Sequence, residues 1–379
     1  MEQFGFIPMV SALLLSMTDH AQTQEEFSGD DNRGRVLVFD VDTSTKLPNN
    51  SKAILNKSAE GLLTSSFTRM VLPSFYTIVF VIGLPANGLA MYNLITKAQR
   101  LPSTIFLMNL AVADLLLCLV LPFKIHYHFL GNHWLFGEAL CRTMTAFFYG
   151  NMYCSILLLT FISVDRYFAL VHPFLSKRFR DNGFAVRSCC VIWLLVVVAM
   201  LPFLLRRQTY PIQNLNITTC HDALPTSLVT DYFFYYFLCL VVFGFFIPSL
   251  ITIFCYLSIV RSLILEESKY SKAIMTMVLV LTVFLICFTP SNITLLVHHS
   301  PIHLTNSNDL YLLYLICLLL STFNSCLDPF IYYYISEEFR NEVRRIVFNK
   351  VKKGKGSRNG FIHTDSSSAS RSAATLRYV

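Results

Sequence analysis

Long runs without charged side chains are the feature that most constrains the fold of this chain. Asp, Glu, Lys and Arg are absent from residues 71–96, 143–164, 188–205, 232–260, 273–302 and 310–327, and residues 101–123 contain only Asp114. A helix of about 20 mostly apolar residues crosses a bilayer and satisfies its own backbone hydrogen bonds there. With 54% hydrophobic and 14% charged residues, the composition excludes an ordinary soluble protein. We therefore predict an all-α membrane protein, a seven-transmembrane helix bundle.

Lysine and arginine residues concentrate in four segments that fall on one side of this bundle. These segments are residues 97–100, 177–187, 261–272 and 340–353. Short loops rich in Lys and Arg stay in the cytoplasm, so the N-terminus is expected outside the cell. Arg206 and Arg207 are the main exceptions.

The remaining segments divide as follows. Residues 1–21 carry an apolar run that favours a cleaved signal peptide over an uncleaved tail, and residues 22–70 are expected to form an extracellular tail. The bundle occupies residues 71–336, and a short amphipathic helix at 337–348 is expected to bind membrane lipid. Residues 349–379, rich in Ser and Thr, read as a disordered cytoplasmic tail. Asn49, Asn56 and Asn216 lie in outer N-x-S/T sequons, which predicts glycosylation.

Polar groups inside the predicted spans are costly and by default mark a functional site. Asp114 lies in the middle of the second span, Ser155 in the third, and Asn324 and Asp328 near the end of the seventh. Together they could bind a sodium ion. A hydrogen-bonded network that only holds the helices together is an equal alternative.

The positions of the eleven cysteines suggest one disulfide. Nine lie in or beside the spans, where a buried thiol acts as a small apolar group. Only Cys141 and Cys220 lie on the oxidising outer side. We predict that they are bonded; a pair of free surface thiols is the weaker alternative.

Several motifs in order along residues 70–348 resemble those of rhodopsin-type G-protein-coupled receptors. They are GLPANG, NLAVAD, DRY, the tryptophan of the fourth span, FTP and DPFIY. The resemblance implies that activation and G-protein coupling involve Asp165, Arg166, Tyr167, Tyr256, Phe288, Pro290, Asp328 and Tyr332. No lysine occurs between Leu310 and Ser336, so the chain cannot hold retinal on its last span as an opsin does.

A narrower resemblance is to the protease-activated receptors. GEALC, FFYGNMYCSIL, LNITTCHDALP and LICFTPSN are similar to that group, most specifically the CHD of the second outer loop. RLPSTIFLMNLAVADLLL and DPFIYYYISEEFR favour its thrombin-activated subtype 4, with subtype 2 next. By this resemblance, Tyr76, His221, Asp222, Tyr311 and Tyr314 would line an outer ligand pocket.

In this family a serine protease cuts the outer tail, and the new N-terminus acts as a tethered ligand. GRVLVFDV falls where the family carries its cut, which implies cleavage after Arg35 and a ligand that begins at Val36 and includes Leu37, Val38, Phe39, Asp40 and Val41. The new α-amine of Val36 would pair with Asp222. Rival cuts follow Arg33, which leaves Gly34 first, and Lys46. The 29 residues from 42 to 70 form a linker that spans about 30 Å as a flexible coil.

The predicted function is that of a plasma-membrane signalling receptor without catalytic activity. Its expected partners are a thrombin- or trypsin-like serine protease, a G protein of the Gq type, arrestin and membrane lipid. We expect no nucleic acid and no cofactor except the sodium ion. One alternative is a receptor for a soluble ligand, such as the purinergic nucleotide receptors. Another is a seven-span transporter built around Asp114 and Asp328, although we see no inverted repeats of the kind such transporters contain.

Overall fold

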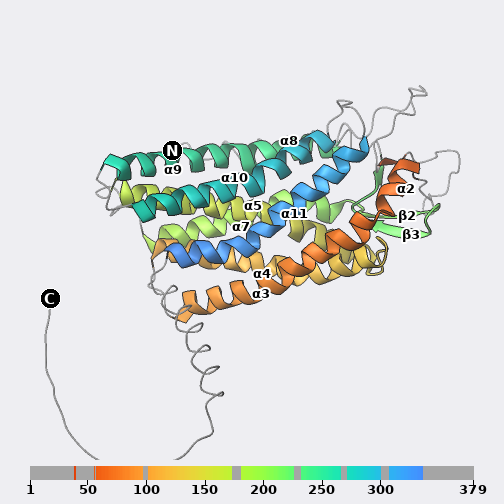
Figure 1. Ribbon diagram of the computed structural model, residues 1–379, viewed down its shortest axis with the longest axis horizontal. Helices are drawn as coiled ribbons and strands as arrows, with labels where there is room; N and C mark the ends of the chain where they lie inside the picture. Colours follow the sequence, from red (N-terminus) through yellow and green to blue (C-terminus); the bar gives the residue numbers. More distant parts are fainter. Residues whose placement is uncertain are drawn as a thin grey trace, which may run out of the picture.

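The computed structural model describes residues 38–39, 55, 57–96, 101–172, 181–225, 232–265, 271–299 and 307–335. Within these ranges, seven helical spans are long and apolar enough to cross a membrane, and they run side by side along the long axis of the molecule (Figure 1). The prediction of a seven-helix bundle is confirmed. The helices are α3 (Leu72–Thr96), α4 (Pro102–Phe129), α5 (Gly137–Leu170), α7 (Asn182–Leu205), α8 (Phe234–Cys239) continued by η4 (Leu240–Phe246) and α9 (Ile247–Leu265), α10 (Ser271–His299) and α11 (Ser307–Ile335).

The burial pattern of the bundle is that of a protein surrounded by lipid. Large apolar side chains such as Leu119 and Phe254 are 64% and 60% exposed, whereas Asn87, Asp114 and Asp328 are fully buried. Lipid solvates apolar surface, so the polar groups are the ones that must turn inward. Helix α5 packs against α4, α7 and α9, so its polar side chains face the interior of the bundle.

The first helical segment begins earlier than the sequence predicted. Residues expected to belong to the outer tail form a short helix, α2 (Lys57–Leu63), and a π-helical turn, η2 (Phe67–Val71), before α3. Leu55, Ala59 and Leu63 are buried, whereas Lys57 is exposed. The charges of Lys57, Glu60 and Arg69 interrupt the apolar pattern here, but one face of the segment still packs onto the protein. These residues precede the bundle boundary at residue 71, which stays a prediction.

Short strands lie in the outer loop between α7 and α8, an addition to the predicted all-α fold. Strands β2 (Thr209–Ile212) and β3 (Ile217–Cys220) form an antiparallel hairpin in which Thr209 faces Cys220 and Ile212 faces Ile217. Asn216, the predicted glycosylation site, lies exposed in the turn with a φ of 51°. A parallel pair joins β1 (Val38–Phe39) to β4 (Leu224–Pro225). The hairpin and α2 lie at the same end of the bundle (Figure 1).

Several predicted features lie outside the described residues. They are the signal peptide 1–21, the sequons at Asn49 and Asn56, the amphipathic helix 337–348, the tail 349–379 and the cleavage region, of which only the backbone of Val38 and Phe39 is described.

The π-helical segment η4 brings the backbone of Gly244 against the ring of Tyr153 on α5. A Cβ atom at residue 244 would lie 2.6 Å from Cδ1 of Tyr153. A contact this short forces the ring or the helix to move. Gly88 on α3 is a helical glycine whose added Cβ would meet no atom within 4 Å.

We therefore expect Gly244→Ala to destabilise the protein by about 1–3 kcal/mol, the usual cost of overpacking. Gly88→Ala is the matched control and should leave stability unchanged or raise it, since alanine favours a helix over glycine. Thermal unfolding of the purified protein in detergent measures both. Equal melting temperatures for Gly244→Ala and the unsubstituted protein would contradict the close approach.

Candidate functional site

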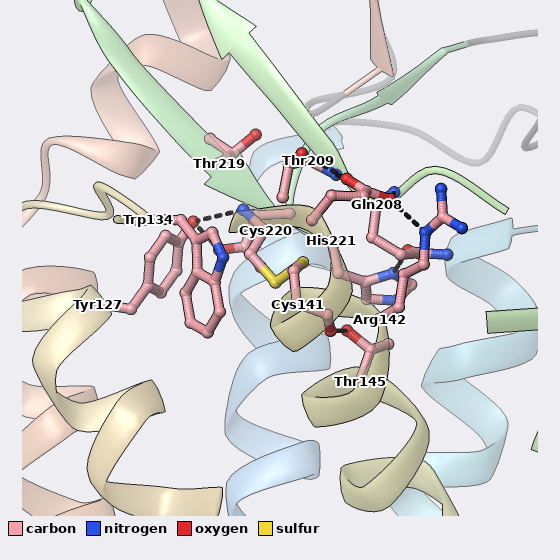
Figure 2. The surroundings of a disulfide bond; sticks show 12 residues. Tyr127, Trp134, Cys141, Arg142, Thr145, Gln208, Thr209, Thr219, Cys220 and His221 are labelled. Carbon is pink, nitrogen blue, oxygen red and sulfur yellow. Dashed lines mark hydrogen bonds and ion pairs between the residues drawn. A yellow bond between two sulfur atoms is a disulfide. The ribbon is translucent and has the colours of Figure 1, made fainter. Parts of the chain in front are cut away.

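A disulfide fixes the outer loop to the end of α5. The bond joins Cys141 on α5 to Cys220 at the end of β3, with 5.8 Å between their Cα atoms, and the predicted pairing is confirmed. The amide of Cys220 donates to the Tyr127 hydroxyl at 3.5 Å, and the amide of Trp134 donates to the carbonyl of Thr218 at 2.7 Å. Figure 2 shows the disulfide between α5 and the hairpin, with Tyr127 and Trp134 beside it.

Glu138 provides a second attachment of the same loop. Its carboxylate accepts hydrogen bonds from the backbone amides of Gln208 at 2.8 Å and Thr209 at 2.9 Å, and from the Thr209 hydroxyl. Arg142, one turn along α5, donates to the same carboxylate. The start of β2 and the end of β3 are therefore both fixed to the first turns of α5.

A chain of hydrogen bonds runs beneath the loop, from α11 to the hairpin. The hydroxyls of Tyr314 and Tyr149 bond to each other, and that of Tyr149 lies 3.3 Å from Nε2 of His221. His221 Nδ1 lies 2.7 Å from Oε1 of Gln208. Burial, with the positive charge of Lys124 adding to it, lowers the pKa of His221 to about 3. The imidazole is thus neutral at physiological pH, donating from Nδ1 to Gln208 and accepting at Nε2 from Tyr149.

Asp222, next to His221, is a carboxylate at the centre of the site. The Tyr127 hydroxyl donates to it at 2.7 Å, and the hydroxyl of Tyr311 is a second donor. Burial raises the pKa of Asp222, and the charge of Lys124 and the two hydroxyls oppose that rise. The half-buried Lys124 Nζ lies 3.9 Å from the centroid of the Phe148 ring. The site therefore holds an anion and a cation in a setting of low polarity.

All five predicted pocket residues lie in this region. Tyr76 is fully buried near Asp222, and its hydroxyl has no hydrogen-bond partner among the described residues. His221, Asp222, Tyr311 and Tyr314 belong to the networks above. The structure thus brings the predicted set together, and binding of a ligand there remains a prediction.

Sequence reasoning missed four residues of the site. They are Lys124, Tyr127, Tyr149 and Gln208. A signal existed for Lys124, because it is the one Lys or Arg between residues 101 and 141 and follows directly on an apolar span. Such a lysine marks a functional site for the same reason as Asp114.

The outer loop also contacts the segment that sequence analysis identified as a ligand. The backbone of Val38 and Phe39 pairs in parallel with Leu224 and Pro225, in the register Val38 to Leu224 and Phe39 to Pro225. Leu224 lies two residues after Asp222 in the chain. The pairing therefore brings Val38 and Phe39 to the edge of the site.

A second polar cluster lies in the middle of the bundle. Asn151 donates to Asp114 at 3.3 Å, and Asn324 donates to Asp328 at 2.8 Å, and the two carboxyl groups are close neighbours. Buried oxygens on four side chains have no hydrogen-bond partner among the described residues. They are Asp114 Oδ2, Ser155 Oγ, Asn324 Oδ1 and Asp328 Oδ1.

The predicted activation residues lie on α5, α9, α10 and α11. Asp165 is buried near the end of α5, and the neighbouring Tyr167 hydroxyl lies 3.0 Å from Nε2 of His172. Tyr256 on α9 is buried within reach of the charge of Arg166. Phe288 is buried on α10, Pro290 lies inside that helix, and Tyr332 lies on α11 with its side chain outside the described part.

Comparison with known proteins gives a consistent result. Residues 86–332 match the family model described as 7 transmembrane receptor (rhodopsin family). The chain is 41% identical to proteinase-activated receptor 3 of Rattus norvegicus, covering 84% of this chain and 89% of the relative. It is 45% identical to proteinase-activated receptor 4 of Rattus norvegicus, covering 80% and 77%. It is 39% identical to proteinase-activated receptor 2 of Homo sapiens, covering 88% and 87%. These values do not separate the subtypes, so the similarity to subtype 4 stays a prediction.

Proposed function

The chain belongs to the rhodopsin family of seven-transmembrane receptors and, within it, to the proteinase-activated receptors, and from this we propose that a protease cuts its outer tail after Arg35. The molecule is a multi-pass receptor of the plasma membrane that signals through G proteins, and it is not an enzyme. In the proposal, the new terminus at Val36 is the agonist, and it binds beneath the outer loop.

The pairing of β1 with β4 is the observation that carries this proposal. Of the outer tail before residue 55, the described part is the backbone of Val38 and Phe39, which is already paired with the loop. A ligand that extends the same parallel register by two residues would bring residue 36 opposite Asp222. This supports the proposal, because Val38 pairs with Leu224, two residues after the carboxylate that would receive the new terminus.

Cleavage supplies the charge that this carboxylate lacks at close range. Before the cut, residue 36 carries a neutral amide; afterwards it carries an α-amine, whose unperturbed pKa is about 7.7–8.0. Tyr127 and Tyr311 donate neutral hydrogen bonds to Asp222, whereas Lys124 lies against Phe148. Charge-assisted hydrogen bonds are roughly twice as strong as neutral ones, so the amine adds an interaction that the intact tail cannot make.

Two rival cuts fit this site less well. Cleavage after Arg33 would put the new α-amine on Gly34, which the same parallel register would place opposite Cys220 and not opposite Asp222. Cleavage after Lys46 would remove Val38 and Phe39, the residues that pair with the loop. We therefore assign the cut to Arg35.

The protease is proposed to be thrombin- or trypsin-like, because such enzymes cut after arginine. Short loops rich in Lys and Arg stay in the cytoplasm. This orientation places the N-terminus and the disulfide-bonded loop outside the cell. Inside the cell, the resemblance supports a G protein of the Gq type, and the Ser- and Thr-rich tail supports arrestin binding after phosphorylation.

Arg166 is proposed to contact the G protein when α9 and α10 rearrange. Its neighbour Asp165 is buried, and Tyr256 on α9 lies within reach of its charge. Pro290 interrupts α10 and permits a bend there. A ligand can shift this equilibrium only by binding one state more tightly than the other.

The buried polar cluster is proposed to bind a sodium ion. Hard cations prefer oxygen ligands, and the cluster offers two neighbouring carboxyl groups and four unpartnered oxygens among the described residues. Asp114, Ser155, Asn324 and Asp328 would hold the ion. Its charge would offset the repulsion between the carboxylates and favour the conformation in which the four residues meet.

The first prediction tests the cut. Arg35→Ala should abolish the calcium response to thrombin or trypsin, because their specificity pocket requires a basic residue. A free VLVFDV peptide should still activate this variant, since the pocket is unchanged, and Arg33→Ala is the matched control that should respond to protease. A full protease response by Arg35→Ala, or no response of the unsubstituted receptor to the peptide, would refute the assignment.

The second prediction concerns coupling. Arg166→Ala should lose most of the calcium response to the VLVFDV peptide at equal surface expression, because the G-protein contact is lost. Arg187→Ala removes an exposed arginine on the same side and should signal normally. Full signalling by Arg166→Ala would show that Arg166 is not the coupling residue.

The third prediction concerns sodium. Replacing sodium chloride by potassium chloride at equal ionic strength should lower the half-maximal concentration of the VLVFDV peptide, because the ion favours the inactive arrangement. In Asp114→Asn the two salts should give the same value, since a ligand charge is gone. A salt effect of equal size in both receptors would exclude this cluster as the sodium site.

A further inference from the structure

The segment before the first span is fixed to the outer end of the bundle. Leu55 is 4% exposed and Leu63 1% exposed, and α2 packs against α11. The carbonyl of Leu63 accepts a hydrogen bond from Asn132 Nδ2 at 2.7 Å and another from Arg69 Nε at 3.3 Å. The C-terminal end of α2 is thus fixed to the turn after α4, where Asn132 adopts a φ of 65°.

Asn214 fixes the other end of this segment, at the tip of the outer hairpin. Its Oδ1 accepts from the amide of Leu55 at 3.4 Å, and its Nδ2 donates to the carbonyl of Leu55 at 3.2 Å. The same Nδ2 donates to Glu60 Oε2 at 3.0 Å. One side chain therefore satisfies both backbone groups of Leu55 and reaches the next turn of the chain.

We propose that Asn214 is a positioning residue of the tethered ligand: by fixing the tail at Leu55, ahead of the attachment at Leu63, it shortens the linker between ligand and receptor from residues 42–62 to residues 42–54. This inference rests on the proposed function, since it concerns how the ligand that begins at Val36 is presented. It assigns to the outer loop a second role, besides forming the wall of the pocket.

The linker then joins two points on one loop. The loop pairs with Val38 and Phe39 through β4 and with Leu55 through Asn214. Between these points Cys220 is bonded to Cys141, which fixes both contacts to α5. The receptor end of the linker and the contact made by Val38 and Phe39 therefore belong to one loop, so they move together.

Shortening the linker changes the local concentration of the ligand. The linker falls from 21 to 13 residues, and the average span of a flexible chain of that length falls from about 25 Å to about 20 Å. Effective concentration decreases as roughly the −3/2 power of linker length. The shorter linker should therefore raise the effective concentration about twofold.

The experiment compares activation by the tethered ligand with activation by the same sequence in solution. Asn214→Ala removes all three hydrogen bonds, and Gln213→Ala changes the exposed neighbour in the same turn as a matched control. Cells expressing each receptor at equal surface level receive graded trypsin, and the fraction of receptor cut is measured beside the calcium response. A separate titration uses the free VLVFDV peptide.

We expect Asn214→Ala to need about twice as much cut receptor for a half-maximal response, with an unchanged half-maximal concentration of free peptide. Gln213→Ala should match the unsubstituted receptor in both titrations. The proposal is overturned if Asn214→Ala needs no more cut receptor, or if its sensitivity to free peptide falls by the same factor, since Asn214 would then act on the pocket itself. Failure of the unsubstituted receptor to answer the free peptide would instead refute the proposed function.

Exchanging the amide and carboxyl groups of residues 214 and 60 tests the contact if the alanine variant fails to reach the cell surface. Asn214→Asp keeps the size of the side chain but loses both donations and places a second carboxylate beside Glu60, so it should also need more cut receptor. Adding Glu60→Gln supplies a donor to the new carboxylate but none to the Leu55 carbonyl, so the value should return part of the way to normal. Absence of this rescue would overturn the role of the contact.

Discussion

The bond between Cys141 and Cys220 is the constraint on which the outer half of this receptor depends. His221 and Asp222 follow Cys220 directly, so their positions above the pocket are set by a covalent link to α5. The hairpin that precedes Cys220 carries Asn214 at its tip, and β4 follows two residues after the histidine–aspartate pair. A loop that lacked this attachment would have to order the pocket, the ligand contact and the tail contact separately, each at an entropic cost.

The charges under the loop explain why proteolysis can act as a switch. Asp222 is buried with neutral donors, His221 is held neutral by burial and by Lys124, and the lysine itself lies over an aromatic ring. Burying an anion without a close cation is costly, so this arrangement favours a ligand that brings a positive charge. The intact tail offers an amide at residue 36. The cut changes one group, from a neutral amide to an amine that could give Asp222 a charge-assisted hydrogen bond.

Much of this architecture can be read from the sequence, for reasons specific to membranes. Charge-free runs identify the spans because lipid tolerates few charges, and Cys141 and Cys220 are the cysteines left on the oxidising side. The helix α2 was missed because Lys57, Glu60 and Arg69 obscure a short buried face that needs the hairpin as its partner. The role of Tyr149 depends on His221, 72 positions away in the chain, and the amide of Gln208 is bound by Glu138, 70 positions away, and no local pattern predicts such contacts.

The most direct measurement is N-terminal sequencing of the receptor recovered from cells treated briefly with thrombin or trypsin, with calcium followed in the same samples. We expect a new N-terminus that reads Val-Leu-Val-Phe-Asp, in an amount that increases in parallel with the calcium signal. Cleavage after Arg35 as the activating step would be contradicted by a new N-terminus at Gly34 or Leu47 whose amount increases with the calcium signal, or by a calcium signal that precedes any cut.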